Sequence, residues 1–369
     1  MRPGIVIGVV ILSALGLTAV TVGHAADEPR GNVTIVDIGI GGALDEALAL
    51  SDAGDYAGAR ERLRNALASG GLNEQEQSQL RYEMARLYVA EGLWSQGAAA
   101  LEEWFATAPE PHAAANYLLA ISYYQLGDYE RALPLATKAV VATAQPPESW
   151  LQLVAAVQLR GEHYAAAIPW LERLTELAPA NKDYWLQLSS AYQHLEQYDR
   201  ALAAMQLAYS AGLLTADVEL HRLTDLLLYN GLPNRSAQIL ESVISERSGV
   251  DPSLDRKLGE SWAAAGELDK AVAPLERVAA AAASGDAFVR LAELHVERRD
   301  WRAAIDALAH ALKKGDLEDP ARAALLTGVA LFGMSHYAEA REWFTRAAGA
   351  DVYRQTANDY IEAIDARVG

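Results

Sequence analysis

The 369-residue sequence contains no cysteine, so a disulfide framework, a thiolate metal site and a cysteine nucleophile are all excluded. Clusters of β-branched residues are few outside the N-terminal segment, which leaves little material for strands. Basic residues are also in short supply, because 31 Lys and Arg face 49 Asp and Glu and the formal net charge is −18. Nucleic-acid binding needs clustered Lys and Arg to neutralise phosphates, so we expect no nucleic-acid partner.

The usual signatures of catalysis are missing as well. None of the eight histidines forms a ligand-spaced pair, and no serine lies in a Gly-x-Ser-x-Gly elbow. The glycine cluster 39–42 is followed by no lysine at the spacing of a phosphate-binding loop. We therefore predict a non-enzymatic protein without a metal or a cofactor, and we interpret His295 as a core histidine.

The N-terminus predicts export. Arg2 precedes an uncharged apolar run over residues 5–22, and the small residues around His24 form a cleavage site that ends at Ala25. Residues 1–25 are therefore interpreted as a signal peptide and the protein as periplasmic. The alternative is an uncleaved anchor in the inner membrane, because a run of this length just spans a bilayer.

The rest of the chain divides into three parts. Residues 26–42 are glycine-rich and lack a helical period, so we predict a linker. Residues 43–350 carry a repeated pattern, and residues 351–369 form one more amphipathic helix. That last helix is expected to cap the array, since terminal repeats need a polar outer face.

The repeat is centred on the phrase Gly127-Asp128-Tyr129, in which a helix-like apolar run meets a glycine, an acid and an aromatic anchor. A small residue follows three positions after each anchor, as Ala132 does here. The anchors recur at intervals of about 34 residues, which is typical of the tetratricopeptide repeat. They are Tyr56, Trp94, Tyr129, Tyr164, Tyr198, Asn234, Leu268, Trp301 and Tyr337.

The residue types have a physical reason. Two antiparallel helices cross closely only where side chains are small, and a glycine lets the first helix end in a left-handed turn. One helix pair cannot bury its apolar faces alone, so the pairs must stack. The sequence thus predicts an all-α, right-handed superhelical solenoid of nine helix-turn-helix repeats and a C-terminal capping helix. Two repeats look irregular: the fourth has an extra residue in its turn at Gly161–Tyr164, and the sixth has Pro233 before the anchor Asn234.

A binding groove is expected on the first helices of the pairs. In this kind of repeat, the positions five, eight and twelve before the anchor line the inner groove, and interfaces favour Tyr and Arg. The alternative is an ordinary amphipathic surface. The candidate residues are Tyr82, Arg86, Tyr117 and Tyr124, followed by Gln158 (counted past the extra residue of repeat four), Gln193 and Glu293.

The whole array also resembles a narrower family, the periplasmic tetratricopeptide proteins that accompany TonB–ExbB–ExbD energy-transduction systems. The phrases that carry this resemblance are Leu50–Tyr56, Tyr184–Ser189, Ala208–Thr215, Ala309–Gly315 and Asp319-Pro320, with the degenerate Gly231-Leu232-Pro233. The resemblance implies a non-enzymatic accessory of TonB-dependent uptake of iron chelates or similar nutrients. Residues 27–42 have no counterpart in that family pattern.

The function predicted from the sequence is therefore a protein-binding scaffold in the bacterial envelope. Its expected partner is a protein or peptide, such as a TonB-, ExbB- or ExbD-like component, and residues 5–22 allow contact with the inner membrane. One alternative is a scaffold for envelope assembly or polysaccharide secretion. Another is a module that binds carbohydrate or peptidoglycan through groove tyrosines.

Overall fold

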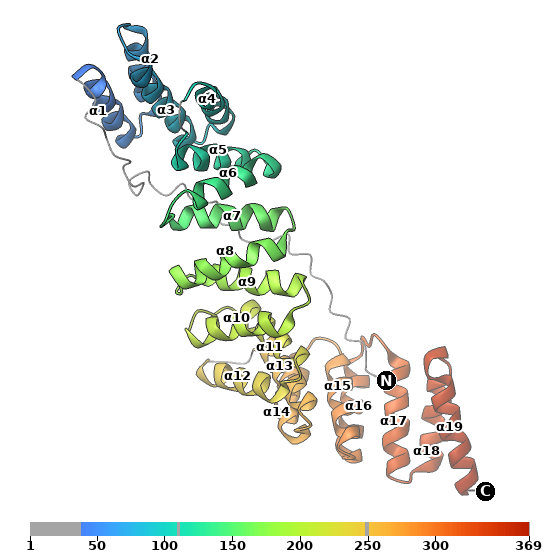
Figure 1. Ribbon diagram of the computed structural model, residues 1–369. Helices are drawn as coiled ribbons and strands as arrows, with labels where there is room; N and C mark the ends of the chain where they lie inside the picture. Colours follow the sequence, from blue (N-terminus) through green and yellow to red (C-terminus); the bar gives the residue numbers. More distant parts are fainter. Residues whose placement is uncertain (1–37, 109–110, 248–250, 369) are drawn as a thin grey trace. The chain divides into compact units, whose positions relative to one another are not determined.

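The computed structural model describes residues 38–108, 111–247 and 251–368, and every regular element among them is an α-helix (Figure 1). The predicted signal peptide lies outside the described residues. The helices are α1 (Ile38–Asp52), α2 (Tyr56–Ala68), α3 (Glu74–Ala90), α4 (Trp94–Thr107), α5 (Ala113–Gln125), α6 (Tyr129–Val141), α7 (Glu148–Arg160), α8 (Tyr164–Leu177), α9 (Lys182–His194), α10 (Tyr198–Ser210), α11 (Asp217–Tyr229), α12 (Pro233–Glu246), α13 (Pro252–Ala264), α14 (Leu268–Ala281), α15 (Asp286–Glu297), α16 (Trp301–Lys314), α17 (Pro320–Gly333), α18 (Tyr337–Ala347) and α19 (Asp351–Val368).

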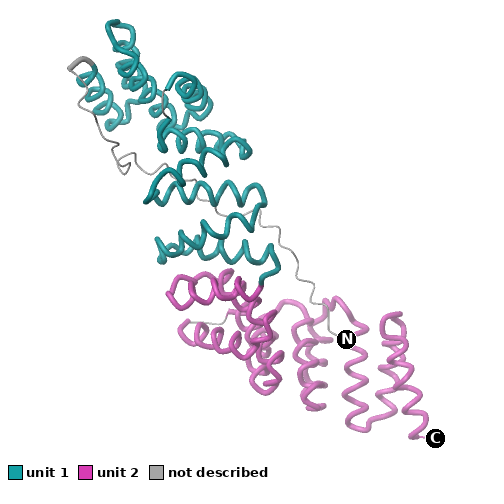
Figure 2. Tube along the Cα trace, in the orientation of Figure 1, with its two compact units in different colours: residues 1–197 teal, residues 198–369 magenta. Residues whose placement is uncertain are grey.

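The helices belong to two compact units (Figure 2). Unit 1 covers residues 1–197 and contains α1 to α9, while unit 2 covers residues 198–369 and contains α10 to α19. The division falls between α9 and α10, inside the fifth repeat. Within each unit, the odd-numbered helices from α1 to α17 are the first helices of their repeats and the even-numbered ones are the second.

One turn geometry ends every first helix from α1 to α17. In repeat three, Gly127 has a φ of 79° and the N–H of Asp128 donates to the Tyr123 carbonyl at 2.9 Å. This is the bond of a Schellman motif, in which a left-handed residue ends the helix. The nine left-handed residues are Gly54, Gly92, Gly127, Glu162, Glu196, Gly231, Gly266, Arg299 and Ser335.

The second helix of each pair crosses the first through small, buried side chains. In repeat three this residue is Ala132, which is fully buried. Glycines on the first helices show how close the contact is. A Cβ added to Gly259 would lie 2.6 Å from Leu275 Cγ, and one added to Gly328 would lie 2.7 Å from the Phe344 ring. The crossing therefore excludes larger residues, as the sequence pattern predicts.

The prediction of an extra turn residue in repeat four was wrong. The turn between α7 and α8 has the same three-residue length as the other turns, and His163 N–H donates to the Gln158 carbonyl as Asp128 N–H does to that of Tyr123. Gln158 is therefore the counterpart of Tyr123. It lies at the position that packs toward the crossing, one residue away from the groove position assigned from the sequence.

The anchor of repeat six also needs correction. Helix α12 begins at Pro233, which stands at the first helical position, where a missing N–H leaves no bond unmade. The small residue at the crossing is then Ser236 instead of Ala237. Its hydroxyl lies 2.8 Å from that of Ser261 on α13, and both side chains are fully buried. A paired hydroxyl is thus accommodated where the other repeats have alanine or glycine.

The predicted linker over residues 26–42 was wrong at its C-terminal end, because α1 begins at Ile38. Ile40 is fully buried in a core cluster with Ala47, Leu63 and Leu80. Burial of that side chain outweighs the low helix propensity of the surrounding glycines, which is about 1 kcal/mol per residue. The part of the predicted linker before residue 38 lies outside the described residues.

The C-terminal cap is confirmed. Helix α19 buries Ala357 and Ile364 against α17 and α18, and the ring of Tyr360 stacks on Phe344 at 4.6 Å. Its remaining surface is largely polar and exposed. The helix thus closes the apolar end of unit 2.

The shared turn leads to a stability prediction. Gly127→Ala should lower the free energy of unfolding by about 1–2 kcal/mol, because an L-residue is strained in the left-handed region. Glu162→Gly should raise it by a smaller amount, since glycine also gains entropy in the unfolded chain. Denaturant unfolding of both variants checks this. Shifts of the same sign would contradict the common geometry.

Candidate functional site

Two of the predicted groove tyrosines are buried between repeats. Tyr82 is 9% exposed, and its ring lies 4.6 Å from that of His112 and 5.2 Å from that of Trp104. Tyr117 is 6% exposed and stacks on Trp150 at 5.3 Å. The expectation that these two rings face a partner is therefore corrected: they join neighbouring helices in the core of unit 1. Burial also lowers the pKa of His112.

The other candidates in unit 1 are half-buried. Arg86 forms an ion pair with Glu83 on its own helix at 2.8 Å. The ring centroid of Tyr124 lies 5.6 Å from that of Tyr129, and the amide of Gln193 donates to the Ser189 hydroxyl at 3.2 Å. No hydrogen bond, ion pair or ring contact among the described residues joins Tyr124, Gln158 and Gln193 to one another.

Glu293, the candidate in unit 2, forms ion pairs with two arginines. Arg322 on α17 is in close contact with it, and Arg290, which lies on α15 as Glu293 does, is 3.3 Å away. The Glu293 side chain is only 15% exposed. It therefore links α15 to α17 and is not a free acid in the groove.

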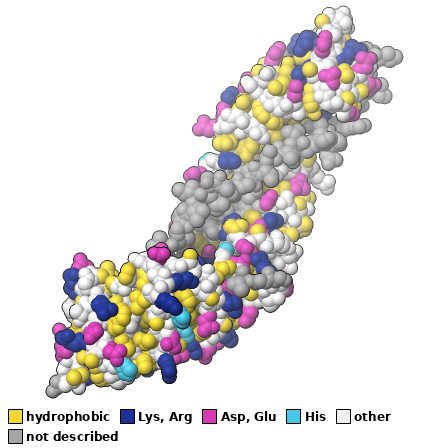
Figure 3. Space-filling model, turned by 180° about the vertical axis from the view of Figure 1, so that it is seen from behind, with side chains coloured by type: hydrophobic (Ala, Val, Ile, Leu, Met, Phe, Trp, Pro, Cys, Tyr) yellow, Lys and Arg dark blue, Asp and Glu magenta, His cyan; other side chains and the backbone are white. Residues whose placement is uncertain are grey.

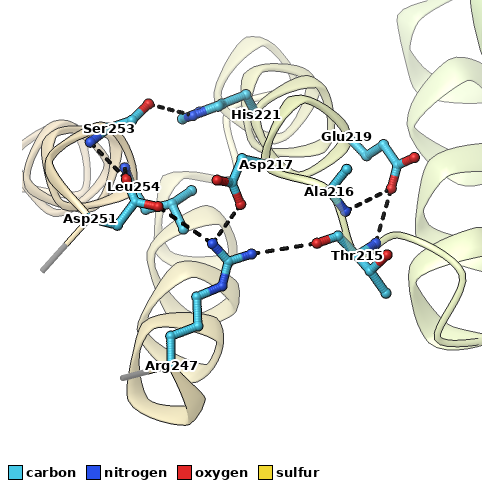
Figure 4. A network of polar contacts seen from close by, with 9 residues as sticks. All are labelled: Thr215, Ala216, Asp217, Glu219, His221, Arg247, Asp251, Ser253 and Leu254. Atoms are coloured by element: carbon cyan, nitrogen blue, oxygen red, sulfur yellow. Dashed lines mark hydrogen bonds and ion pairs between the residues drawn. The ribbon is translucent and has the colours of Figure 1, made fainter. Parts of the chain in front are cut away.

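The more open polar site lies in unit 2, where α11 and α13 meet beside the end of α12. Arg247 follows α12 and joins the first turns of the two neighbouring helices (Figure 4). Its guanidinium lies 2.5 Å from the Asp217 carboxylate of α11 and 3.4 Å from the Asp251 carboxylate that caps α13. It also donates to the Thr215 carbonyl at 3.5 Å. These contacts fix the two first helices side by side.

Each of the two helices has its own N-terminal support (Figure 4). Glu219 accepts hydrogen bonds from the backbone N–H groups of Thr215 and Ala216, both at 3.0 Å. Asp251 accepts from the N–H groups of Ser253 and Leu254 at 3.0 and 3.2 Å. Acceptors at these positions satisfy N–H groups that have no partner inside the helix. The first turns of α11 and α13 are therefore each closed by a carboxylate acceptor.

A cleft lies where α11 and α13 meet, and most of the residues that line it belong to α13. His221 on α11 lies 2.8 Å from the Ser253 hydroxyl of α13, and Lys257 forms an ion pair with Asp225 of α11 at 2.5 Å. These two contacts tie the helices together across the cleft. The residues that line it are His221, Asp251, Pro252, Ser253, Arg256, Lys257 and Glu260.

Two charged residues in this cleft have no partner among the described residues. Arg256 is exposed, Glu260 is half-buried, and neither forms a hydrogen bond or an ion pair. Counted from the anchor Leu268, they occupy the positions that Tyr82 and Arg86 occupy in repeat two. The sequence prediction missed them, although the same spacing applied to Leu268 identifies both.

The surface of unit 2 carries mixed charge. In Figure 3, acidic and basic side chains are scattered among apolar ones over the visible face of unit 2, without a large area of one sign.

The remaining features agree with a structural role. His295 is buried, lies 3.3 Å from Arg298, and has a pKa lowered first by burial and then by that arginine. It belongs to the core, as expected. No group of three or more acidic, histidine or cysteine residues suited to a metal ion occurs in the described part of the chain. None of the described helices has the length and apolar character needed to cross a membrane.

This geometry places the protein in a class, the arrays of stacked helix-turn-helix repeats. A family model of the tetratricopeptide repeat matches residues 82–148, 222–287 and 289–353, and a second model of the same repeat matches residues 183–211. Together these matches cover more than half of the chain. The protein belongs to the tetratricopeptide repeat family, whose fold is generally a non-enzymatic scaffold.

The chain is also similar to solved structures. A tetratricopeptide repeat protein from Parabacteroides merdae is 16% identical, with 70% of this chain and 99% of that chain covered and a TM-score of 0.41. YrrB, described as having an unusual peptide-binding site, is 16% identical over 49% of this chain and 89% of its own, with a TM-score of 0.42. The Naa15/Naa10 complex bound to HypK-THB is 13% identical over 88% of this chain and 50% of the matched chain, with a TM-score of 0.53. A search of curated protein sequences gave no match.

Proposed function

We propose that this protein is a non-enzymatic scaffold that binds a segment of a partner protein in the cleft between α11 and α13. The observation that carries the proposal is the pair of charged residues, Arg256 and Glu260, that line the cleft and form no hydrogen bond or ion pair among the described residues. Charged groups left open in a cleft are available for complementary pairing, which gives specificity and correct register to a protein interface.

The walls of the cleft support this role. Lys257 and Asp225 join α11 to α13 at 2.5 Å, and Arg247 holds their first turns. A preformed site loses little conformational entropy when it binds, so more of the contact energy appears as affinity. An extended or helical peptide is the ligand that such a cleft between helices fits best.

The finer part of the proposal concerns the biological system. We infer an exported accessory of a TonB–ExbB–ExbD machine that supports uptake of iron chelates or similar nutrients. The sequence resemblance of the array and the export signal predicted at residues 1–25 support this assignment. The partner segment would then be a periplasmic part of a TonB-, ExbB- or ExbD-like component.

A crosslinking experiment tests both levels of the proposal. A photo-reactive amino acid is placed at position 256 in the cleft, and in a control at position 302, an exposed residue on α16. After irradiation in the native cell, we expect a covalent adduct with one protein at position 256 and a weaker or absent adduct at position 302.

The identity of the adduct decides between the functions. A TonB-, ExbB- or ExbD-like protein supports the finer proposal, whereas a component of polymer export or envelope assembly replaces it and leaves the scaffold role in place. Equal labelling at both positions, or no protein adduct at position 256, would contradict the cleft as the binding site.

A further inference from the structure

The inference concerns the chemistry of the segment that the cleft accepts, and it rests on the proposed function. On α13, a basic residue of the cleft precedes an acidic one. Arg256 and Glu260 are four residues apart on one helix and both line the cleft, yet they form no ion pair with each other. A base placed before an acid at this spacing is the weaker order for pairing within a helix. Both groups therefore stay available to a ligand.

In the neighbouring repeats, the acid at the position of Glu260 is paired. Asp225, Glu260 and Glu293 occupy the same repeat position, eight residues before the second helix begins at Pro233, Leu268 and Trp301. Asp225 binds Lys257 of the next first helix at 2.5 Å, and Glu293 binds Arg322 of the next first helix in a close ion pair. In this series, only Glu260 lacks such a pair among the described residues.

The counterpart of Lys257 in the next repeat binds another acid. Arg290 on α15 occupies the repeat position of Lys257. It lies 3.3 Å from Glu293 on its own helix and forms no ion pair with Glu260. Glu260, the acid of repeat seven, is thus available to a basic group of a partner.

The spacing of the two charges defines the ligand. Four residues along an α-helix span about 6 Å, and two residues along an extended strand span about 6.6 Å. We propose that the cleft binds an extended peptide with an acidic and a basic residue two positions apart. The acidic residue pairs with Arg256 and the basic residue with Glu260. The rest of the cleft fixes the direction of the bound chain, so only one order of the two charges makes both pairs.

Fluorescent peptides test this proposal with the full-length protein. Two twelve-residue peptides have the same uncharged background and carry either Glu-x-Lys or Lys-x-Glu at their centre. A third peptide carries the same two charges at its opposite ends. Anisotropy at low ionic strength should show at least a tenfold preference for one central order over the other, and for that order over the third peptide.

Charge exchange on the protein supplies the decisive comparison. The double variant Arg256→Glu, Glu260→Lys keeps the net charge and should bind the reversed peptide order preferentially. The matched control is Arg302→Glu, Asp306→Lys, which exchanges an exposed pair of the same spacing on α16 and should keep the wild-type preference. Circular dichroism of each variant checks that the helices are intact.

The results distinguish this inference from the proposed function. Equal affinity for both orders, an unchanged preference in the double variant, or binding of none of the three peptides would overturn the acid-x-base rule. A protein adduct at position 256 would still support the scaffold role in each of those cases. Loss of that adduct would instead contradict the proposed site itself.

Discussion

Replacing Phe344 with alanine is expected to lower the free energy of unfolding of unit 2 by about 3–5 kcal/mol, the usual cost of removing a buried phenylalanine. Phe344 is fully buried and stacks on Tyr360 of the capping helix at 4.6 Å. Across the helix crossing stands Gly328, which has no side chain to fill the space left by the ring. The cavity can therefore collapse only through movement of the backbone.

Hydrogen exchange followed by mass spectrometry measures the effect, because it reports α17, α18 and α19 separately from the rest of the array. We expect faster exchange in these three helices in Phe344→Ala. Val352→Ala is the matched control, since Val352 lies on α19 but is 82% exposed, and surface changes of this kind stay within about 0.5 kcal/mol. Equal exchange in the two variants would refute the assigned role of Phe344.

The second large effect is expected in unit 1 from Trp104→Ala, again about 3–5 kcal/mol. Trp104 is 5% exposed and packs against Tyr82 and His112. Its indole N–H donates to the Ser78 carbonyl at 3.0 Å and to the Ser78 hydroxyl at 2.9 Å. The variant thus loses both apolar burial and a polar tie between α3 and α4.

A conservative variant separates the two contributions. Trp104→Phe retains a large apolar ring but loses the N–H donor, so its cost should be only about 1–3 kcal/mol, including the unpaired acceptors that it leaves. Urea unfolding monitored by circular dichroism gives both values. If Trp104→Phe were as damaging as Trp104→Ala, the ring packing would not be the main stabilising term.

Most of the fold was predictable because the repeat signal depends on backbone geometry. Wherever a first helix ends in a left-handed residue and a small residue follows at the crossing, as at Gly127 and Ala132, the pattern is visible in the sequence. The two errors of register arose where these markers change. Glu162 takes the left-handed conformation without being glycine, and Ser236 replaces the small apolar residue of repeat six.

The start of the array was harder to predict for a different reason. Glycines around Ile40 indicated a linker, but the burial of that single side chain stabilises a helix that already begins at Ile38. Local propensity gives no information on a tertiary contact with Leu63 or Leu80. Helix boundaries that depend on such contacts are not accessible from one sequence.

The candidate site was the least predictable part. The spacing rule places residues on the inner side of a repeat, but it does not say how closely neighbouring first helices pack. Tyr82 and Tyr117 satisfy the rule and are nevertheless buried, whereas Arg256 and Glu260 satisfy it and line an open cleft. The ion pairs are equally hard to foresee, because Arg290 contacts Glu293 on its own helix and Glu260 forms no ion pair among the described residues.

The uniform turn has a consequence for how the array can evolve. Four of its nine left-handed positions, Glu162, Glu196, Arg299 and Ser335, are held by residues other than glycine. A strain of about 1–2 kcal/mol at each is small beside the stability that stacked neighbours share. A turn position can therefore accept several residue types and keep its geometry. Repeats can thus diverge in sequence at this position while their first helices still end in the same way.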